Sequence, residues 1–200
     1  MRGRRADGRN RRSRHARAAR AHPRPRLLIV CAPYYRAIAD DLIAGAQAVL
    51  AEAGAGADLV EVPGALEVPV AIRLAAEARA YEGYVALGCV IRGETTHYET
   101  VCNDSSRGLM LLGVERGLAI GNGILTCETI AQAEIRAARP PAVAEGQDKG
   151  GGAAAAALHL IALARRFRSG GGGSGASGPG PDAPGADILL AAAATQPRTA

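Results

Sequence analysis

Apolar residues along this chain alternate between two patterns, one typical of strands and one typical of helices. Short continuous apolar runs have the length of buried strands, and between them apolar residues recur as on one face of a helix. The predicted strands are residues 27–32, 58–62, 84–90 and 118–125. The predicted helices are residues 38–53, 69–80, 98–116, 129–138 and 149–167. Strands that are apolar throughout and alternate with helices are typical of a parallel sheet covered on both faces, so the pattern predicts an α/β fold.

Proline and glycine residues mark where several of these elements end. Pro33 interrupts the chain after the first strand, Gly54 follows the first helix, and Gly117 follows the third. A second helix that starts near Pro69 fits the tolerance of helix first turns for proline. Because connections between parallel strands are right-handed, few topologies remain, and the flavodoxin-like doubly wound sheet is among them. We expect four parallel strands flanked by helices in a three-layer α/β/α arrangement.

The two ends of the chain lack this patterning. Residues 1–26 contain eleven arginines and one acid, Asp7, a charge of +10, so the other 174 residues carry −5 of the net +5. Such a basic arm cannot form a core, and it could contact nucleic acid or an acidic surface, act as an organellar presequence, or be a disordered extension. It lacks the aromatic residues that stack on bases, and we favour the extension. Residues 169–200 have the glycine-, proline- and alanine-rich composition of a disordered tail, which leaves residues 27–168 as one domain.

Several function classes lack their signatures in this sequence. The basic arm is not followed by the apolar core of a secretory signal, and no apolar run is long enough for a membrane span. No Walker or G-x-G-x-x-G pattern occurs, so a dinucleotide or nucleoside triphosphate is not indicated. The four cysteines, Cys31, Cys89, Cys102 and Cys127, lie apart, without C-x-x-C pairs that would ligate a metal. Because three of them lie in or beside apolar segments, we expect reduced thiols in a cytoplasmic protein and no metal site.

The segments that leave the carboxyl ends of the predicted strands carry most of the candidate chemistry, because ligands of open parallel sheets bind at that edge. They are residues 34–35, 63–67, 88–99 and 122–126. In the third segment, a glycine turn, two threonines that can cap a helix, and His97 follow a buried strand. Backbone N–H groups at a helix start bind anions, and an imidazole exchanges protons near neutral pH. The sequence therefore predicts proton-transfer chemistry on a phosphorylated small molecule.

Several short motifs together resemble the lumazine synthase family of riboflavin biosynthesis. They are V-P-G-A-L-E-V-P (62–69), A-L-G-C-V-I-R-G-E-T-T-H-Y-E (86–99), G-I-L-T (123–126), Q-A-E-I-R-A (132–137) and D-K-G-G (148–151). The resemblance covers about residues 27–168. It implies condensation of 5-amino-6-(D-ribitylamino)uracil with 3,4-dihydroxy-2-butanone 4-phosphate to 6,7-dimethyl-8-ribityllumazine. It also implies no metal or organic cofactor, and a homo-oligomer, a pentamer or a multiple of pentamers, with active sites between neighbouring subunits.

The resemblance gives each candidate residue an expected role. The residues expected to bind the ribitylaminouracil are Tyr34, Ala65, Leu66, Glu67, Cys89, Val90, Ile91 and Asn122. The residues expected to bind the butanone phosphate are Glu94, Thr95, Arg136 and Lys149. Asn122 and Arg136 would come from the neighbouring subunit, and His97 would carry protons during imine formation and phosphate loss. Because a carboxylate beside a phosphate is unfavourable, we expect the Glu94 side chain to turn away and backbone N–H groups to bind the anion.

Without the resemblance, these side chains have simpler interpretations. Tyr34 could be a half-buried tyrosine at a strand end, Glu67 a solvated charge at a helix start, and Arg136 a charge that complements a helix dipole. Two positions also depart from the family pattern: Tyr35 replaces the usual asparagine, and Asn122 stands where many relatives carry phenylalanine. Two alternative functions therefore remain, a flavin- or lumazine-binding carrier with little catalysis and a shell-forming protein whose arm packages acidic cargo.

Overall fold

The computed structural model describes residues 24–169, and residues 1–23 and 170–200 of the predicted arm and tail lie outside the described residues. The strands are β1 Arg26–Ala32, β2 Gly56–Glu61, β3 Gly83–Ile91 and β4 Ala119–Cys127. The helices are α1 Arg36–Glu52, α2 Glu67–Glu77, α3 His97–Arg116, α4 Ile130–Ala137 and α5 Lys149–Ser169. Every predicted strand and helix is present, in the predicted order. Among these described helices, none is both long enough and apolar enough to cross a membrane.

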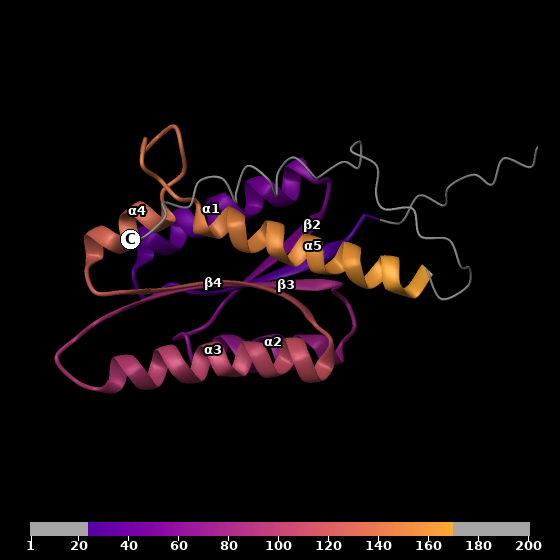
Figure 1. The fold of residues 1–200 in the computed structure, drawn as a ribbon, viewed down its shortest axis with the longest axis horizontal. Helices are drawn as coiled ribbons and strands as arrows, with labels where there is room; N and C mark the ends of the chain where they lie inside the picture. Colours follow the sequence, from indigo (N-terminus) through magenta and orange to yellow (C-terminus); the bar gives the residue numbers. More distant parts are fainter. Residues whose placement is uncertain (1–23, 170–200) are drawn as a thin grey trace, which may run out of the picture.

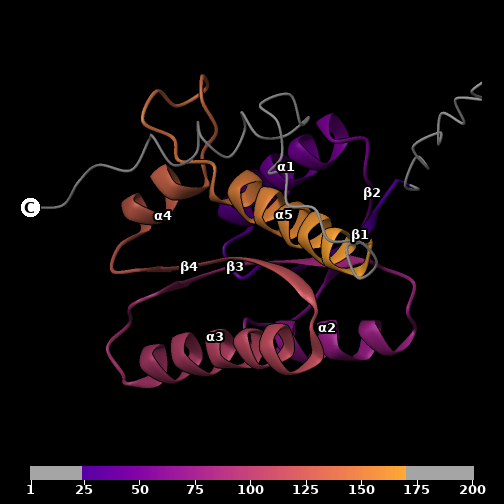
Figure 2. The same ribbon diagram turned by 45° about the vertical axis from the view of Figure 1, so that its right-hand side comes forward.

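The four strands form one parallel sheet in the order β2-β1-β3-β4. Helices α1, α4 and α5 cover one face of the sheet, and α2 and α3 cover the other (Figure 1, Figure 2). The predicted three-layer, flavodoxin-like arrangement is therefore confirmed. Because the chain moves from β1 to β2 on one side and continues to β3 on the other side of β1, the strand order reverses there. Ligands of open α/β sheets bind at such a switch point, outside the carboxyl ends of the strands.

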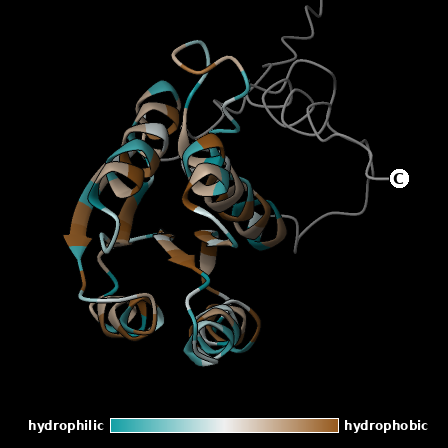
Figure 3. Cartoon of the chain, turned by 90° about the vertical axis from the view of Figure 1, so that its left-hand side faces the viewer, coloured by the Kyte–Doolittle hydropathy of each residue, from teal (hydrophilic) through white to brown (hydrophobic). Residues whose placement is uncertain are grey.

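Side chains of β1 alternate between two hydrophobic cores, one on each face of the sheet. Leu27, Ile29 and Cys31 are buried in the core formed with α1, α4 and α5. Leu28 and Val30 are buried in the core formed with α2 and α3. Figure 3 shows the hydrophobic strands between the two helix layers. A strand that is buried on both faces has a continuous apolar sequence. This explains why the predicted bounds of β1, residues 27–32, differ from the observed bounds by one residue.

Strand β2 departs from the predicted coverage on both faces. It is an edge strand, paired with β1 alone among the described strands. Most of its side chains are exposed, including Leu59 at 40% and Val60 at 44%. Its last residue, Glu61, forms an ion pair with Arg36 of α1 at 2.6 Å. The expectation of complete coverage is therefore wrong for β2, because an apolar run does not reveal which strand lies at the edge of a sheet.

Two glycines allow α5 to lie very close to its neighbours. A Cβ atom at Gly121 of β4 would overlap the backbone of Ala153 in α5. A Cβ atom at Gly150 of α5 would overlap the backbone of Leu42 in α1. Glycine weakens an isolated strand, but here its missing side chain permits the packing of a helix directly onto the sheet.

Strand β4 continues beyond its predicted end at residue 125. Its ladder with β3 extends to the pair Ile91 and Cys127, which sets the end of the strand. Asn122 consequently lies in the middle of β4, where it pairs with Ala86. The expectation that residues 122–126 follow the carboxyl end of this strand is wrong. These residues are part of β4, because each of them pairs with a residue of β3.

Candidate active site

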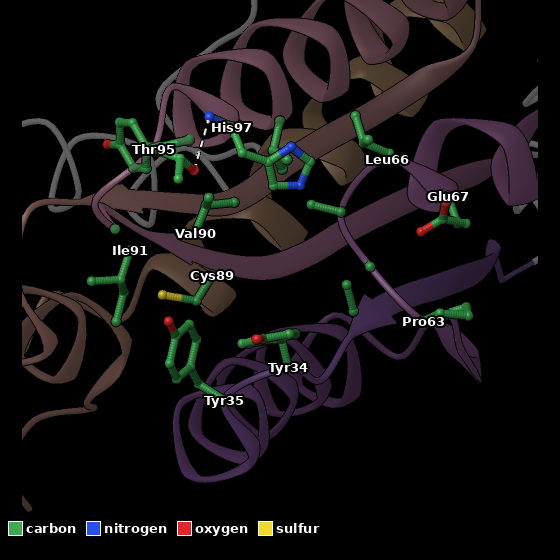
Figure 4. A pocket seen from close by; sticks show the side chains of 16 residues that line it. Tyr34, Tyr35, Pro63, Leu66, Glu67, Cys89, Val90, Ile91, Thr95 and His97 are labelled. Carbon is green, nitrogen blue, oxygen red and sulfur yellow. Dashed lines mark hydrogen bonds between the residues drawn. The ribbon is translucent and has the colours of Figure 1, made fainter.

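A cavity of about 540 Å³ lies at the carboxyl edge of the sheet, at the switch point between β1 and β3 (Figure 4). Its walls come from the turns after β1 and β2, the last residues of β3, and the start of α3. The lining residues are Ala32, Tyr34, Tyr35, Pro63, Gly64, Ala65, Leu66, Glu67, Cys89, Val90, Ile91, Gly93, Thr95, His97, Tyr98 and Val101. The volume is in the range of small-molecule sites, and the lining combines apolar walls with a few polar groups.

Most of the site residues predicted from the sequence line this cavity. They are Tyr34, Ala65, Leu66, Glu67, Cys89, Val90, Ile91, Thr95 and His97. Three strands deliver them to one edge because parallel strands end on the same side of a sheet. The fold therefore brings together residues that are more than sixty positions apart in the chain, such as Tyr34 and His97.

Four predicted residues do not line the cavity of their own chain: Glu94, Asn122, Arg136 and Lys149. Glu94 is exposed in the loop between β3 and α3. The exposed Asn122 side chain accepts a hydrogen bond from the backbone N–H of Ile124 at 3.0 Å. Arg136 lies on α4 and donates to a backbone carbonyl of that helix at 3.2 Å, and Lys149 is the first residue of α5.

Two tyrosines form the aromatic wall of the cavity. The Tyr34 ring is 76% exposed and contacts Tyr35 in a T-shaped arrangement with ring centroids 5.1 Å apart. Figure 4 shows the Tyr35 hydroxyl pointing toward Cys89. Burial raises the pKa of Tyr35, and the neighbouring Tyr34 and Cys89 raise it further. Tyr35 therefore presents a neutral hydroxyl, while Tyr34 presents a free aromatic face to the cavity.

The loop between β3 and α3 brings His97 to the cavity. His97 is the first residue of α3, and its imidazole faces the cavity in Figure 4. The Thr95 hydroxyl accepts a hydrogen bond from the His97 backbone N–H at 3.4 Å. Thr96 is the N-cap residue but forms no side-chain cap bond, so of the two predicted capping threonines only Thr95 contributes a hydroxyl. Because Thr96 forms no cap bond, the later N–H groups of this first turn are available to another acceptor, such as an anion.

The Cys89 side chain belongs to the wall of the cavity rather than to its chemistry. Burial raises its pKa to about 12, and the neighbouring thiol of Cys127 adds to the effect. The thiolate is the reactive form of cysteine, so this thiol is not a nucleophile near neutral pH. None of the four cysteines forms a disulfide with another described residue.

Sequence reasoning assigned no role to Arg92 and Tyr98, although both lie within the 86–99 motif. Tyr98 lines the cavity, and the Arg92 guanidinium lies over its ring at 4.2 Å from the centroid. The Arg92 Nε also donates to a carboxylate oxygen of Glu128 at 2.6 Å, and a second guanidinium nitrogen pairs with Glu99. The Arg92 hydrogen bond lowers the pKa of Glu99. An arginine directly before the glycine turn could have marked Arg92 as a candidate residue. The sequence spacing, however, does not show which carboxylates it contacts.

Comparison with known proteins places these features in a family. A family profile described as 6,7-dimethyl-8-ribityllumazine synthase matches residues 24–165. The 6,7-dimethyl-8-ribityllumazine synthase of Azorhizobium caulinodans is 55% identical over 131 residues, 63% of this chain and 78% of the relative. The protein of the same description from Bartonella bacilliformis is 55% identical over 118 residues, 58% of this chain and 78% of the relative. A third, from Novosphingobium aromaticivorans, is 52% identical over 126 residues, 63% of this chain and 86% of the relative.

Proposed function

Because the chain belongs to the 6,7-dimethyl-8-ribityllumazine synthase family, we propose that its cavity condenses 5-amino-6-(D-ribitylamino)uracil with 3,4-dihydroxy-2-butanone 4-phosphate. The product of this reaction is 6,7-dimethyl-8-ribityllumazine, an intermediate of riboflavin biosynthesis. The observation that supports the chemistry is that an exposed aromatic ring, a carboxylate, a helix start whose N-cap residue forms no cap bond, and an imidazole share one cavity. This set suits a flat heterocycle at one end and a phosphate at the other.

The turns after β1 and β2 form the half of the cavity that we assign to the ribitylaminouracil. The exposed face of Tyr34 can stack on the pyrimidine ring, which offers contact area at little cost in side-chain entropy. The Glu67 carboxylate and the backbone of Ala65 and Leu66 can bind the hydroxyl groups of the ribityl chain. The backbone of residues 89–91 then lies beside the polar edge of the uracil.

The start of α3 forms the half of the cavity that we assign to the butanone phosphate. The Thr95 hydroxyl and the backbone N–H groups of this helix start bind the phosphate, at the positive end of the helix dipole. The exposed Glu94 side chain stays in solvent. Arg136 and Lys149 lie outside the cavity of their own chain, and we assign them to the phosphate of a neighbouring subunit's site. A guanidinium binds a phosphate through two parallel hydrogen bonds, which makes Arg136 the stronger of the two contacts.

We assign proton transfer to His97, whose imidazole faces the cavity. An amino group of the uracil attacks the ketone carbonyl, and loss of water gives an imine. A proton then leaves the carbon next to the imine, and the phosphate departs with the electrons of its C–O bond. The resulting enol takes up a proton at its terminal carbon and becomes a ketone, which the second amine attacks. The second amine closes the ring with loss of water. An imidazole can accept and return these protons near neutral pH, and positioning of two reactive partners adds to its effect.

Exposed apolar side chains on α2 and α3 support assembly into an oligomer. Val70, Leu74, Met110, Leu111 and Val114 are all more than 40% exposed in the single chain. Apolar surface of this kind commonly marks a contact with another molecule. We propose a homo-oligomer, a pentamer or a multiple of pentamers, in which Asn122 and Arg136 complete the site of the next subunit. We also propose a cytoplasmic location, which the four free thiols support.

The direct test is to mix the purified protein with both substrates and to follow the fluorescence of the lumazine product. We expect formation well above the uncatalysed rate. Binding of lumazine or flavin without turnover would contradict the enzyme and favour the carrier. Nucleic acid that co-purifies with an inactive particle would favour the shell-forming protein.

A mixing experiment tests whether the site is shared between subunits. His97→Ala and Arg136→Ala chains are co-expressed in equal amounts and compared with each variant alone. If Arg136 acts on the neighbouring subunit, about one site in four of a randomly mixed ring has both native residues, so activity should recover to about a quarter of the native value. Activity no higher than the mean of the two variants would contradict a shared site.

A further inference from the structure

A group of charged side chains connects the loop at the phosphate half of the cavity to two other elements. Arg92 follows β3, Glu99 lies in the first turn of α3, and Glu128 lies between β4 and α4. The Arg92 guanidinium forms ion pairs with both carboxylates, that to Glu128 at 2.6 Å. It also covers the ring of Tyr98, which lines the cavity. One side chain therefore joins the ends of two strands and the start of a helix.

The loop that this group surrounds has few constraints of its own. It comprises residues 93–96, between Arg92 and the start of α3. A Cβ atom at Gly93 would meet nothing within 4 Å, so no neighbouring element packs against that position. Within the described residues, the side-chain hydrogen bonding of this loop consists of the bond from the His97 N–H to Thr95, at 3.4 Å. The position of the loop must therefore be set largely from its two ends, where Arg92 and Glu99 lie.

The arrangement of charge argues against Arg92 as a direct ligand of the phosphate. An arginine next to an anion site is ordinarily a candidate for bidentate binding. Here two carboxylates face one guanidinium, so the group carries a net charge of −1. The backbone N–H of Arg92 is also engaged, since it donates to the Cys127 carbonyl at 3.0 Å. Its hydrogen-bonding capacity is directed toward protein groups rather than toward the cavity.

We propose that Arg92 is a positioning residue that holds the β3–α3 loop, and with it Thr95 and His97, in the geometry that binds the butanone phosphate. This inference rests on the proposed function. Glu99 fixes the start of α3 through Arg92, and Glu128 connects the same guanidinium to the segment between β4 and α4. The ring of Tyr98, which lines the cavity, packs against the Arg92 guanidinium. Without these contacts Thr95 and His97 are no longer held at fixed positions relative to each other. A displacement of a catalytic group by about 1 Å can lower the rate about a hundredfold.

The test compares Arg92→Ala, Glu99→Gln and Glu128→Gln with the native protein in steady-state kinetics of lumazine formation. Arg92→Ala should raise the KM for the butanone phosphate about 10- to 100-fold, lower kcat because His97 is displaced with the loop, and leave the KM for the ribitylaminouracil within about twofold. Glu99→Gln and Glu128→Gln should each raise the same KM by a smaller factor. Arg92→Lys keeps the charge but loses the planar fork, so it should restore only part of the affinity.

Arg26 provides a matched control at the opposite edge of the sheet. It also pairs with a carboxylate, Asp58, at 2.6 Å, and its guanidinium also lies near a tyrosine ring, that of Tyr81, at 5.2 Å. Arg26→Ala therefore removes an ion pair and a contact with a tyrosine ring, as Arg92→Ala does, but at a distance from the cavity. It should leave both KM values unchanged, which separates the loss of an exposed ion pair from the loss of loop position.

The outcomes distinguish the inference from the proposed function. No lumazine formation by the native protein would overturn the proposed function itself. An active native protein whose KM values do not change in the Arg92 and glutamate variants would overturn the positioning role alone. If Arg92 binds the phosphate directly, Glu99→Gln and Glu128→Gln should free the guanidinium and lower the KM for the butanone phosphate, the opposite of the change expected here.

Discussion

Replacing Tyr34 by alanine tests whether its ring binds the uracil or merely packs at a strand end. The side chain is 76% exposed, so about a quarter of its surface is in contact with the protein. If about 200 Å² is taken for the whole side chain, the hidden part contributes about 1 kcal/mol, and the T-shaped contact with Tyr35 adds about 0.5–1.5 kcal/mol. Stacking of a ring on a base is worth about 1–3 kcal/mol, so affinity for the ribitylaminouracil should fall about 5- to 150-fold.

The assay is calorimetric titration of the Tyr34→Ala protein with the ribitylaminouracil, alongside a thermal unfolding scan. We expect the melting temperature to fall by less than about 10 °C, because the lost contacts sum to about 2 kcal/mol. Tyr34→Phe is the matched control, since it keeps the ring and should bind within about twofold of the native protein. Native affinity in Tyr34→Ala with a lower melting temperature would refute stacking and leave the tyrosine a structural role.

Four further substitutions or reactions test other parts of the molecule. His97→Ala should slow turnover about 5- to 100-fold without abolishing it, because the positioned substrates still react; an unchanged kcat would remove His97 from the proton steps. Arg136→Ala should raise the KM for the butanone phosphate about 10- to 100-fold and spare that for the uracil, since a charge-assisted bond is lost; equal changes in both would point to misfolding. Gly121→Ala should lower the melting temperature by about 4–12 °C through overlap with α5, whereas Gly152→Ala, where a Cβ meets nothing within 4 Å, should not. Cys89 should react with iodoacetamide at pH 8 about a thousandfold more slowly than a free thiol, because a pKa raised to about 12 lowers its thiolate fraction by about that factor; rapid labelling of the folded protein would contradict its burial.

The order of strands and helices could be predicted because each element has a periodicity that its own residues determine. The ends of β2 and β4 could not, since they depend on pairing with another strand. The ladder between Ile91 and Cys127 carries β4 beyond its apolar run. The exposure of Leu59 and Val60 follows from the position of β2 at the edge, which depends on the topology of the whole sheet.

The candidate site also contains residues that the sequence could predict and residues that it could not. Tyr34, Glu67 and His97 could be grouped from the sequence because they follow the carboxyl ends of parallel strands, which share one edge. The contacts of Arg92 could not, because Glu99 and Glu128 lie 7 and 36 positions away and only the fold brings them together. The sequence resemblance, rather than any periodicity, suggested Arg136, since its expected partner is a second copy of the chain.

The close approach of α5 to β4 and α1 makes the chain unevenly tolerant of genetic change. A side chain at position 121 or 150 would overlap the backbone of another element, so a substitution there lowers the stability of the fold. This cost arises from packing beneath α5 and does not depend on the substrate. The turn at Gly93 carries no such restriction on volume, since an added Cβ meets nothing within 4 Å. A randomised library selected for growth should therefore recover side chains at position 93 more often than at positions 121 and 150, where they would overlap the backbone of a neighbouring element.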